Sequence, residues 1–98
     1  MNFEWDAEKE RKNLRKHGIR FSTAKLVFND LNRLEYFDEV HSLHEDRFVI
    51  IGKVAGTLTV LVVVYTERTN SIRIISARPA LKNEEEAYYA NQRNFKSN

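Results

Sequence analysis

The stretch of sequence that decides the fold is residues 57–78, TLTVLVVVYTERTNSIRIISAR. Its first half, Thr57 to Thr66, is apolar on both faces of an extended chain, as expected of a strand in the middle of a sheet. The short segment Arg68 to Ser71 permits a hairpin but not a parallel crossover. Ser71 to Arg78 then has the pattern of a returning strand. We therefore predict an antiparallel pair of strands at the centre of a sheet.

Two more strands precede this pair. Arg33 to Phe37 and Arg47 to Val54 have the strand pattern, and the latter is joined to the central strand through Gly52 to Gly56. This connection is again too short for a crossover helix. The four strands should therefore form an antiparallel meander.

Helical signals come before the strands. Asp6 is placed to cap a helix from Ala7 to Lys16, and Gly18 can take the left-handed conformation that ends it. Ser22 is the candidate cap of a short helix from about Thr23 to Asn29. The sequence thus predicts two helices ahead of the sheet.

The two ends of the chain complete the predicted fold. Phe3-Glu4-Trp5 alternates in polarity and is a possible short strand. After Pro79, Asn83 and Glu86 are spaced like a capping box, and the helix that follows should pack mainly through Tyr88. The predicted class is α+β: two N-terminal helices on a four-stranded antiparallel meander, a possible short N-terminal strand and one C-terminal helix.

Composition limits the class of protein. Ninety-eight residues with 42% hydrophobic content fit a single domain, residues 1–98, with one core. The absence of cysteine excludes a disulfide framework and a thiolate metal site. The N-terminus has acids where a signal peptide needs bases, and the longest apolar run, Leu58 to Tyr65, is far below the roughly 20 residues that span a membrane. We expect a cytoplasmic protein.

Charge is distributed unevenly although the net charge is only +2. Acids dominate residues 35–46 and 84–86, whereas the intervening segment is basic. The bases of that segment are Arg47, Lys53, Arg68, Arg73, Arg78 and Lys82, with Glu67 as its single acid. A basic surface on the sheet is expected, and its natural partner is a polyanion.

Short patches spread along most of the chain carry a family resemblance. In order, they are Phe3-Glu4-Trp5-Asp6, Lys9, Asn13, Lys16-His17-Gly18-Ile19, Phe21, His41-Ser42, Glu45, Arg47, Ile51-Gly52, Val64-Tyr65-Thr66-Glu67-Arg68 and Arg73-Ile74-Ile75-Ser76-Ala77-Arg78. Their order and spacing, more than any one patch, resemble the BrnT family. BrnT proteins are toxins of bacterial type II toxin–antitoxin pairs, with a RelE-like fold and ribonuclease activity.

The resemblance implies a toxin that cleaves RNA, inhibits translation and growth, and is silenced by a BrnA-like antitoxin. It implies a heterotetramer with dimeric antitoxin, in which operator DNA is contacted mainly by the antitoxin. It also implies cleavage without metal or cofactor, because RelE-like toxins use lysine, arginine and tyrosine. The acidic run Glu84-Glu85-Glu86 departs from the basic C-terminal helix that is usual in the family. The sheet and first helix are therefore the expected RNA surface.

Attack of a 2′-hydroxyl on the adjacent phosphate needs groups that accept and donate a proton, and cations that stabilise the phosphate charge. The catalytic candidates are Arg68, Arg78, Arg73, Tyr65 and His17, and the substrate-binding candidates are Lys16, Arg47 and Lys53. The hypothesis requires the guanidinium groups to converge on one concave patch. Dispersed arginines, or arginines each neutralised by a carboxylate, would argue against a nuclease centre there.

The candidates also have structural interpretations. Arginines late in a strand often form surface ion pairs, and Tyr65 suits a core aromatic whose hydroxyl reaches the rim. Lys16-His17-Gly18 is what a helix stop prefers. Because side chains alternate along a strand, Arg73 and Arg78 are expected on opposite faces unless a bulge intervenes.

Two other functions stay open from the sequence. One is a non-catalytic module of the same fold, whose arginines hold nucleic acid or antitoxin. The other is a metal-dependent hydrolase using His41, His44 and Glu45. The metal reading is weak because these residues lack the His-Glu-x-x-His order on a helix, and we predict no metal site.

Overall fold

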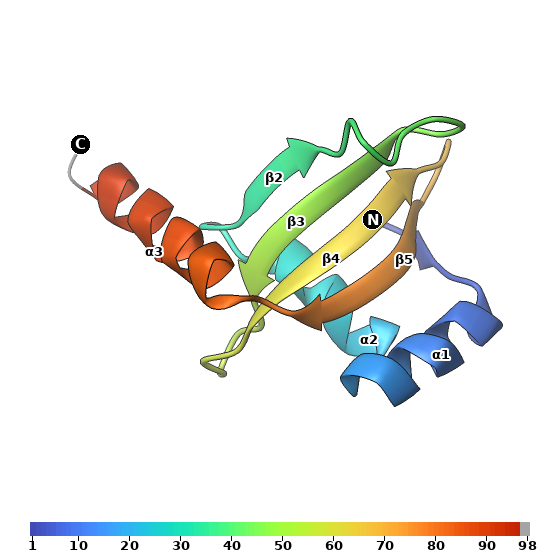
Figure 1. Ribbon diagram of the computed structural model, residues 1–98, viewed down its shortest axis with the longest axis horizontal. Coiled ribbons are helices and arrows are strands. Elements are labelled where there is room, and N and C mark those ends of the chain that lie inside the picture. The colour runs from blue at the N-terminus through green and yellow to red at the C-terminus, as the bar shows by residue number, and fades with distance from the viewer. Residues whose placement is uncertain (97–98) are drawn as a thin grey trace.

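A twisted five-stranded sheet organises the chain (Figure 1). The computed structural model describes residues 1–96, and side chains through residue 92. The strands are β1 (Phe3–Glu4), β2 (Leu34–Phe37), β3 (Arg47–Lys53), β4 (Val60–Glu67) and β5 (Ile72–Pro79). They lie in the order β1-β5-β4-β3-β2, antiparallel except for β1, which pairs parallel to β5. The predicted α+β meander with β4 at its centre is confirmed, and the possible N-terminal strand forms.

Helices pack on both faces of the sheet. They are α1 (Ala7–His17), α2 (Phe21–Ala24), the 3-10 helix η1 (Lys25–Asn29) and α3 (Lys82–Lys96). In Figure 1, α2 lies behind the central strands, α1 lies beside β5, and α3 projects from one corner. The face toward the viewer is therefore open away from α3. Of the helices in the described part, none is long and apolar enough to cross a membrane.

The predicted start and stop of α1 are confirmed. The Lys9 backbone N–H donates to Asp6 Oδ1 at 2.9 Å, which satisfies one of the free amides of the first turn. Gly18 has a φ of 71° and donates its N–H to the Leu14 carbonyl at 2.8 Å. Glycine takes this left-handed conformation without a steric cost, so the helix ends there.

The two other predicted caps are wrong. α2 begins at Phe21, ahead of Ser22, and its first amide is bound by a carboxylate of another helix: the Phe21 N–H donates to Glu10 Oε2 at 2.9 Å. At α3, Glu84 Oε1 accepts the Leu81 N–H at 2.7 Å, two residues ahead of the predicted capping box. At both helices a glutamate side chain accepts the first free amide, and this amide lies ahead of the predicted cap residue.

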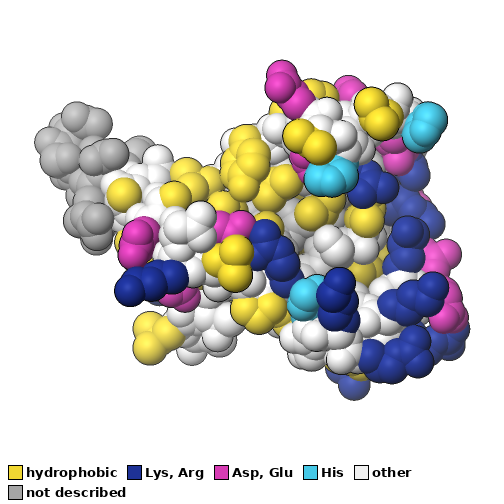
Figure 2. Space-filling view, viewed as in Figure 1, with side chains coloured by type: hydrophobic (Ala, Val, Ile, Leu, Met, Phe, Trp, Pro, Cys, Tyr) yellow, Lys and Arg dark blue, Asp and Glu magenta, His cyan; other side chains and the backbone are white. Residues whose placement is uncertain are grey.

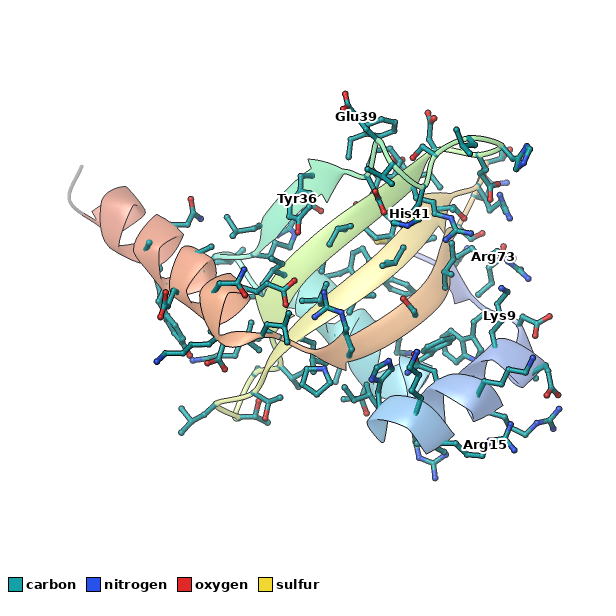
Figure 3. All side chains as sticks on the ribbon, viewed as in Figure 1. Lys9, Arg15, Tyr36, Glu39, His41 and Arg73 are labelled. Carbon is teal, nitrogen blue, oxygen red and sulfur yellow. The ribbon has the colours of Figure 1, made fainter. Side chains whose placement is uncertain are left out.

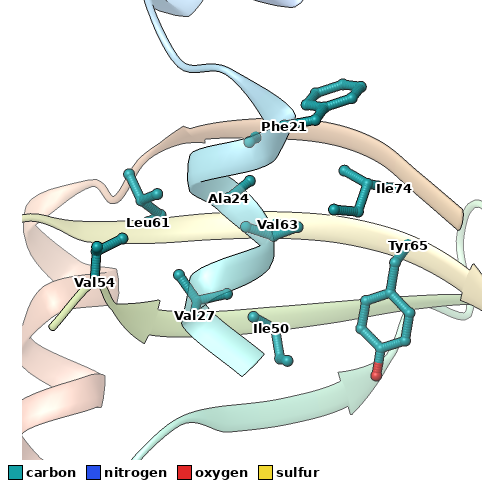
Figure 4. Close-up of a cluster of buried hydrophobic side chains, with 10 residues drawn as sticks. Phe21, Ala24, Val27, Ile50, Val54, Leu61, Val63, Tyr65 and Ile74 are labelled. Carbon is teal, nitrogen blue, oxygen red and sulfur yellow. The ribbon is translucent and has the colours of Figure 1, made fainter. Parts of the chain in front are cut away.

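The core forms two layers, one on each face of the sheet. The larger lies between the sheet and the α2–η1 segment and is shown in Figure 4. Its buried members are Phe21, Ala24, Val27, Ile50, Val54, Leu61, Val63, Tyr65, Ile74 and Ala77. The smaller layer, on the open face, consists of Val49, Ile51, Val60 and Val62 under Tyr88 of α3. The Tyr88 hydroxyl donates to Asp30 Oδ2 at 2.5 Å, so Tyr88 anchors α3 through both packing and a hydrogen bond.

Asn13 closes the edge of β5 where β1 stops. β1 pairs only with Ile72 and Arg73, which leaves the later β5 backbone without a strand neighbour on that side. The Asn13 side chain takes the place of one: its Nδ2 donates to the Ala77 carbonyl at 2.9 Å, and its Oδ1 accepts the Ala77 N–H at 3.0 Å. A third bond joins Nδ2 to the Ile19 carbonyl at 3.0 Å. One buried amide thus ties α1, the following loop and β5 together.

Candidate functional site

A bulge in β5 decides which side chains share the open face. The register between β4 and β5 shifts midway, so β5 contains one extra residue. Arg73 consequently pairs with Thr66 and Arg78 with Val62, two β4 residues that point the same way. Val62 belongs to the core layer of the open face. The bulge that would bring Arg73 and Arg78 to one face is therefore present, and both side chains lie on the open face.

Each of the three predicted catalytic arginines is already bound to a carboxylate. The ion pairs are Arg68 with Glu45, Arg73 with Glu4, and Arg78 with Glu84. Arg73 Nη1 lies 2.5 Å from Glu4 Oε2, and Arg78 donates to both oxygens of Glu84 at 2.7 and 2.8 Å. The bond from Arg78 holds the pKa of Glu84 below its ordinary value. Each arginine links a different pair of segments, so the three do not form one cationic centre.

Other predicted residues lie away from the open face of the sheet or at its margins. Tyr65 is buried in the larger core layer, and burial raises its pKa to about 12. Lys16 and His17 occupy the last turn of α1. Lys53 lies at the end of β3, with its Nζ 5.9 Å from the ring centre of Tyr89 on α3. Tyr65, His17 and Lys53 therefore do not line the groove on the open face.

The open face is hollowed between β2, the loop of residues 38–46 and β5. This groove has a volume of about 440 Å³. Its floor is apolar, and its polar lining residues are Tyr36, Asp38, His41, Arg47, Ser76 and Arg78. Figure 3 labels Tyr36 at β2 and His41 in the loop that follows β2, both toward the top of the view. Of the sequence candidates, the groove brings together only Arg47 and Arg78.

His41 is the residue that sequence reasoning missed. Its Nδ1 lies 2.9 Å from Asp38 Oδ2 and 3.2 Å from Asp38 Oδ1. A carboxylate at this nitrogen holds the proton there, which leaves Nε2 free to exchange protons. The sequence signal was the spacing Asp38-x-x-His41, which suits a turn in which the carboxylate reaches the imidazole. From the sequence, His41 belongs to a patch of the family resemblance and to the disfavoured metal site, but it is not among the catalytic candidates.

The loop that carries this pair is fixed by Ser42. The Ser42 hydroxyl accepts the Arg47 backbone N–H at 2.9 Å and donates to the Asp38 carbonyl at 2.5 Å. The Asp38 N–H in turn donates to the Arg47 carbonyl at 2.9 Å. One hydroxyl therefore bridges the two ends of the loop and places His41 beside the start of β3.

Arg47 and Tyr36 supply the other chemistry of the groove. Within the described residues, Arg47 makes no ion pair, unlike the three arginines above. Burial, and next the charge of Glu84, raise the pKa of Tyr36, so its phenol keeps its proton near neutral pH. An imidazole, a protonated phenol and an unpaired guanidinium thus share one hollow. Across residues 1–92, no group of three histidine, aspartate or glutamate side chains is close enough to hold a metal ion.

The exposed side of α1 adds a second basic surface. Lys9, Arg11, Lys12, Arg15 and Lys16 are exposed there, and only Arg11 is in an ion pair, with Glu8. Figure 2 shows dark blue side chains gathered over this helix, below and to the right of the groove. Figure 3 places Arg73 between Lys9 and the sheet. The basic surface expected on the sheet is therefore strongest on α1.

The fold and groove define a small α+β protein equipped for proton transfer beside a cation, with a basic helix at its flank. A model of the family described as "Ribonuclease toxin, BrnT, of type II toxin-antitoxin system" matches residues 5–84. The chain belongs to the BrnT family, and the resemblance drawn from its sequence patches is confirmed. It is thereby a member of the ribonuclease toxins of type II systems, whose partner is an antitoxin protein. No curated protein matches the chain.

Proposed function

We propose that this toxin is a metal-independent endoribonuclease whose reaction takes place in the groove between β2 and β5. The observation that carries the proposal is the His41–Asp38 pair facing the same hollow as the unpaired Arg47. Such a set supplies a proton acceptor and a positive charge without a metal ion. Cleavage of cytoplasmic RNA would account for arrest of translation and growth.

The groove residues fit an attack of the RNA 2′-hydroxyl on the adjacent phosphorus. His41 Nε2 takes the 2′-hydroxyl proton as the bond from O2′ to phosphorus forms, and Arg47 stabilises the negative charge that develops on the phosphate oxygens. The bond from phosphorus to O5′ breaks, and the Tyr36 hydroxyl donates a proton to that oxygen. The products are a 2′,3′-cyclic phosphate and a 5′-hydroxyl end.

The remaining arginines hold the site in this account. Arg78 lines the groove, but Glu84 occupies two of its donors, so its main role is to hold the first turn of α3 beside the groove. Arg68 fixes the β4–β5 turn to the 38–46 loop through Glu45, and Arg73 fixes β1 to β5 through Glu4. The bases of α1, Lys16 included, bind the RNA backbone, which makes binding dependent on salt.

Removal of the groove cation tests the proposal. Wild-type protein freed of antitoxin should cleave RNA in EDTA, and Arg47→Ala should lower the rate by about 100-fold, because transition-state charge loses its partner. Lys53→Ala is the matched control: both residues lie on the same face of β3, but Lys53 lies outside the groove. Its rate should stay within about threefold of wild type.

Three results would contradict parts of the proposal, each differently. Loss of cleavage in EDTA would favour the metal-dependent hydrolase. No cleavage by folded wild-type protein would favour the non-catalytic binding module. Equal loss in Arg47→Ala and Lys53→Ala would place the reaction outside the groove.

The partner is proposed to be a BrnA-like antitoxin, which forms a heterotetramer as an antitoxin dimer bound to two toxins. Operator DNA is then contacted mainly by the antitoxin. Inhibition by coverage needs an interface of at least the usual size, on the order of 1,200–2,000 Å². Size-exclusion chromatography with light scattering on the co-expressed pair measures this stoichiometry.

A further inference from the structure

An exposed apolar surface lies at the end of β2 and continues into the 38–46 loop. Its side chains are Tyr36, Val40 and Leu43, here called the β2 rim. Val40 and Leu43 are 75% and 84% exposed, and both line a hollow of about 310 Å³ next to the groove. Figure 2 shows apolar side chains among acidic ones at this upper end of the molecule. Several large apolar groups exposed together mark an interaction site.

The backbone beside the β2 rim is also open. β2 is the last strand of the sheet, and in the described part of the chain β3 is its only strand neighbour. Asp38 donates its N–H to Arg47 of β3, so the alternation of antiparallel bonds turns the amides of Glu35 and Phe37 outward. Unpaired amides beside apolar side chains are a template for an added strand.

The charge of this segment selects the kind of partner. Residues 34–46 contain no lysine or arginine and five carboxylates. Glu35, Asp38 and Glu45 have partners in Arg33, His41 and Arg68, whereas Glu39 and Asp46 make no ion pair within the described residues. The unpaired negative charge favours a protein segment with apolar and basic side chains.

We propose that the β2 rim is the seat of the antitoxin, which adds an extended apolar and basic segment to the edge of β2. Val40 and His41 line both the groove and the neighbouring hollow, so a segment seated on the rim also closes the groove to RNA. This mode of inhibition rests on the proposed function of the groove. Toxins of type II systems have an antitoxin protein as their partner, and the β2 rim is an exposed surface on which this partner can bind.

The test uses the purified chain, with the co-expressed BrnA-like antitoxin as the probe. Leu43→Lys removes an apolar anchor and adds a repelling charge, so Kd should rise about tenfold or more. Leu58→Lys makes the same change at a leucine that is 85% exposed on the β3–β4 connection, and its Kd should stay at the wild-type value. Glu39→Lys, beside the rim, should likewise raise Kd. Glu86→Lys makes the same change on α3, away from the rim, and should leave Kd at the wild-type value.

Two further readouts separate the interface from the active site. RNA cleavage by Leu43→Lys should equal that of wild type, because Leu43 does not line the groove. In the complex, hydrogen exchange at the Glu35 and Phe37 amides should slow by about tenfold or more. Unchanged Kd in both Leu43→Lys and Glu39→Lys, or unprotected β2 amides in the complex, would overturn the proposal. If wild type cleaves no RNA, the proposed function fails, yet the Kd and exchange data still decide the binding surface.

Discussion

His41→Ala is expected to slow RNA cleavage by a factor of about 100 to 10,000, the usual contribution of one acid–base side chain. The imidazole is the groove's proton acceptor, and its orientation depends on the 2.9 Å contact with Asp38. Asp38→Asn should lower the rate less, because the imidazole remains but the amide no longer holds its tautomer. Rates on a short fluorogenic RNA, with circular dichroism to confirm folding, measure both effects.

His44 provides a matched control in the same loop. It is also exposed, but it does not line the groove. His44→Ala should therefore cleave RNA within about twofold of the wild-type rate. A similar loss in His41→Ala and His44→Ala would show that the loop matters as a whole and would remove His41 from its catalytic role.

Asn13→Ala is expected to lower the free energy of unfolding by about 3 kcal/mol. The substitution leaves the Ala77 N–H and the carbonyls of Ala77 and Ile19 without the side chain that binds them. Each buried polar group left unsatisfied costs about 1–3 kcal/mol, partly relieved where water enters. For a chain of this size the loss lowers Tm by more than about 10 °C.

Urea unfolding followed by tryptophan fluorescence measures this loss. Asn91→Ala, at an exposed position of α3, is the control and should change stability by less than about 0.5 kcal/mol. A loss below about 1 kcal/mol for Asn13→Ala would mean that water or backbone movement replaces the amide, and that β5 needs no substitute neighbour.

The parts of the fold that the sequence predicted depend on local signals. Asp6 and Gly18 define α1 because a cap and a left-handed glycine act within one turn of the helix. The meander followed from connections too short for any other topology. The two caps that the sequence did not predict are made by Glu10, which lies on another helix, and by Glu84, which accepts an amide ahead of the predicted capping box.

The candidate site was harder to predict because its geometry depends on distant residues. Arg73 meets Glu4 across 69 positions of sequence, so neither residue indicates the pair by itself. The alternation of apolar and polar residues in β5 does not reveal its extra residue. This residue nevertheless places Arg73 and Arg78 on the same face. Arg68, Arg73 and Arg78 are each paired with a carboxylate, which argues against a catalytic centre formed by all three. The groove with Arg47 and His41 takes its place.

The central claim is that RNA binds for reaction in the groove beside His41 and Arg47. An NMR titration with a short RNA carrying a 2′-O-methyl group at the cleavage position tests it directly, because this RNA binds without being cut. The account predicts the largest shift changes at the His41 ring and at the Arg47 and Ser76 amides, with smaller ones along α1. Changes confined to α1, with the groove signals unmoved, would contradict it.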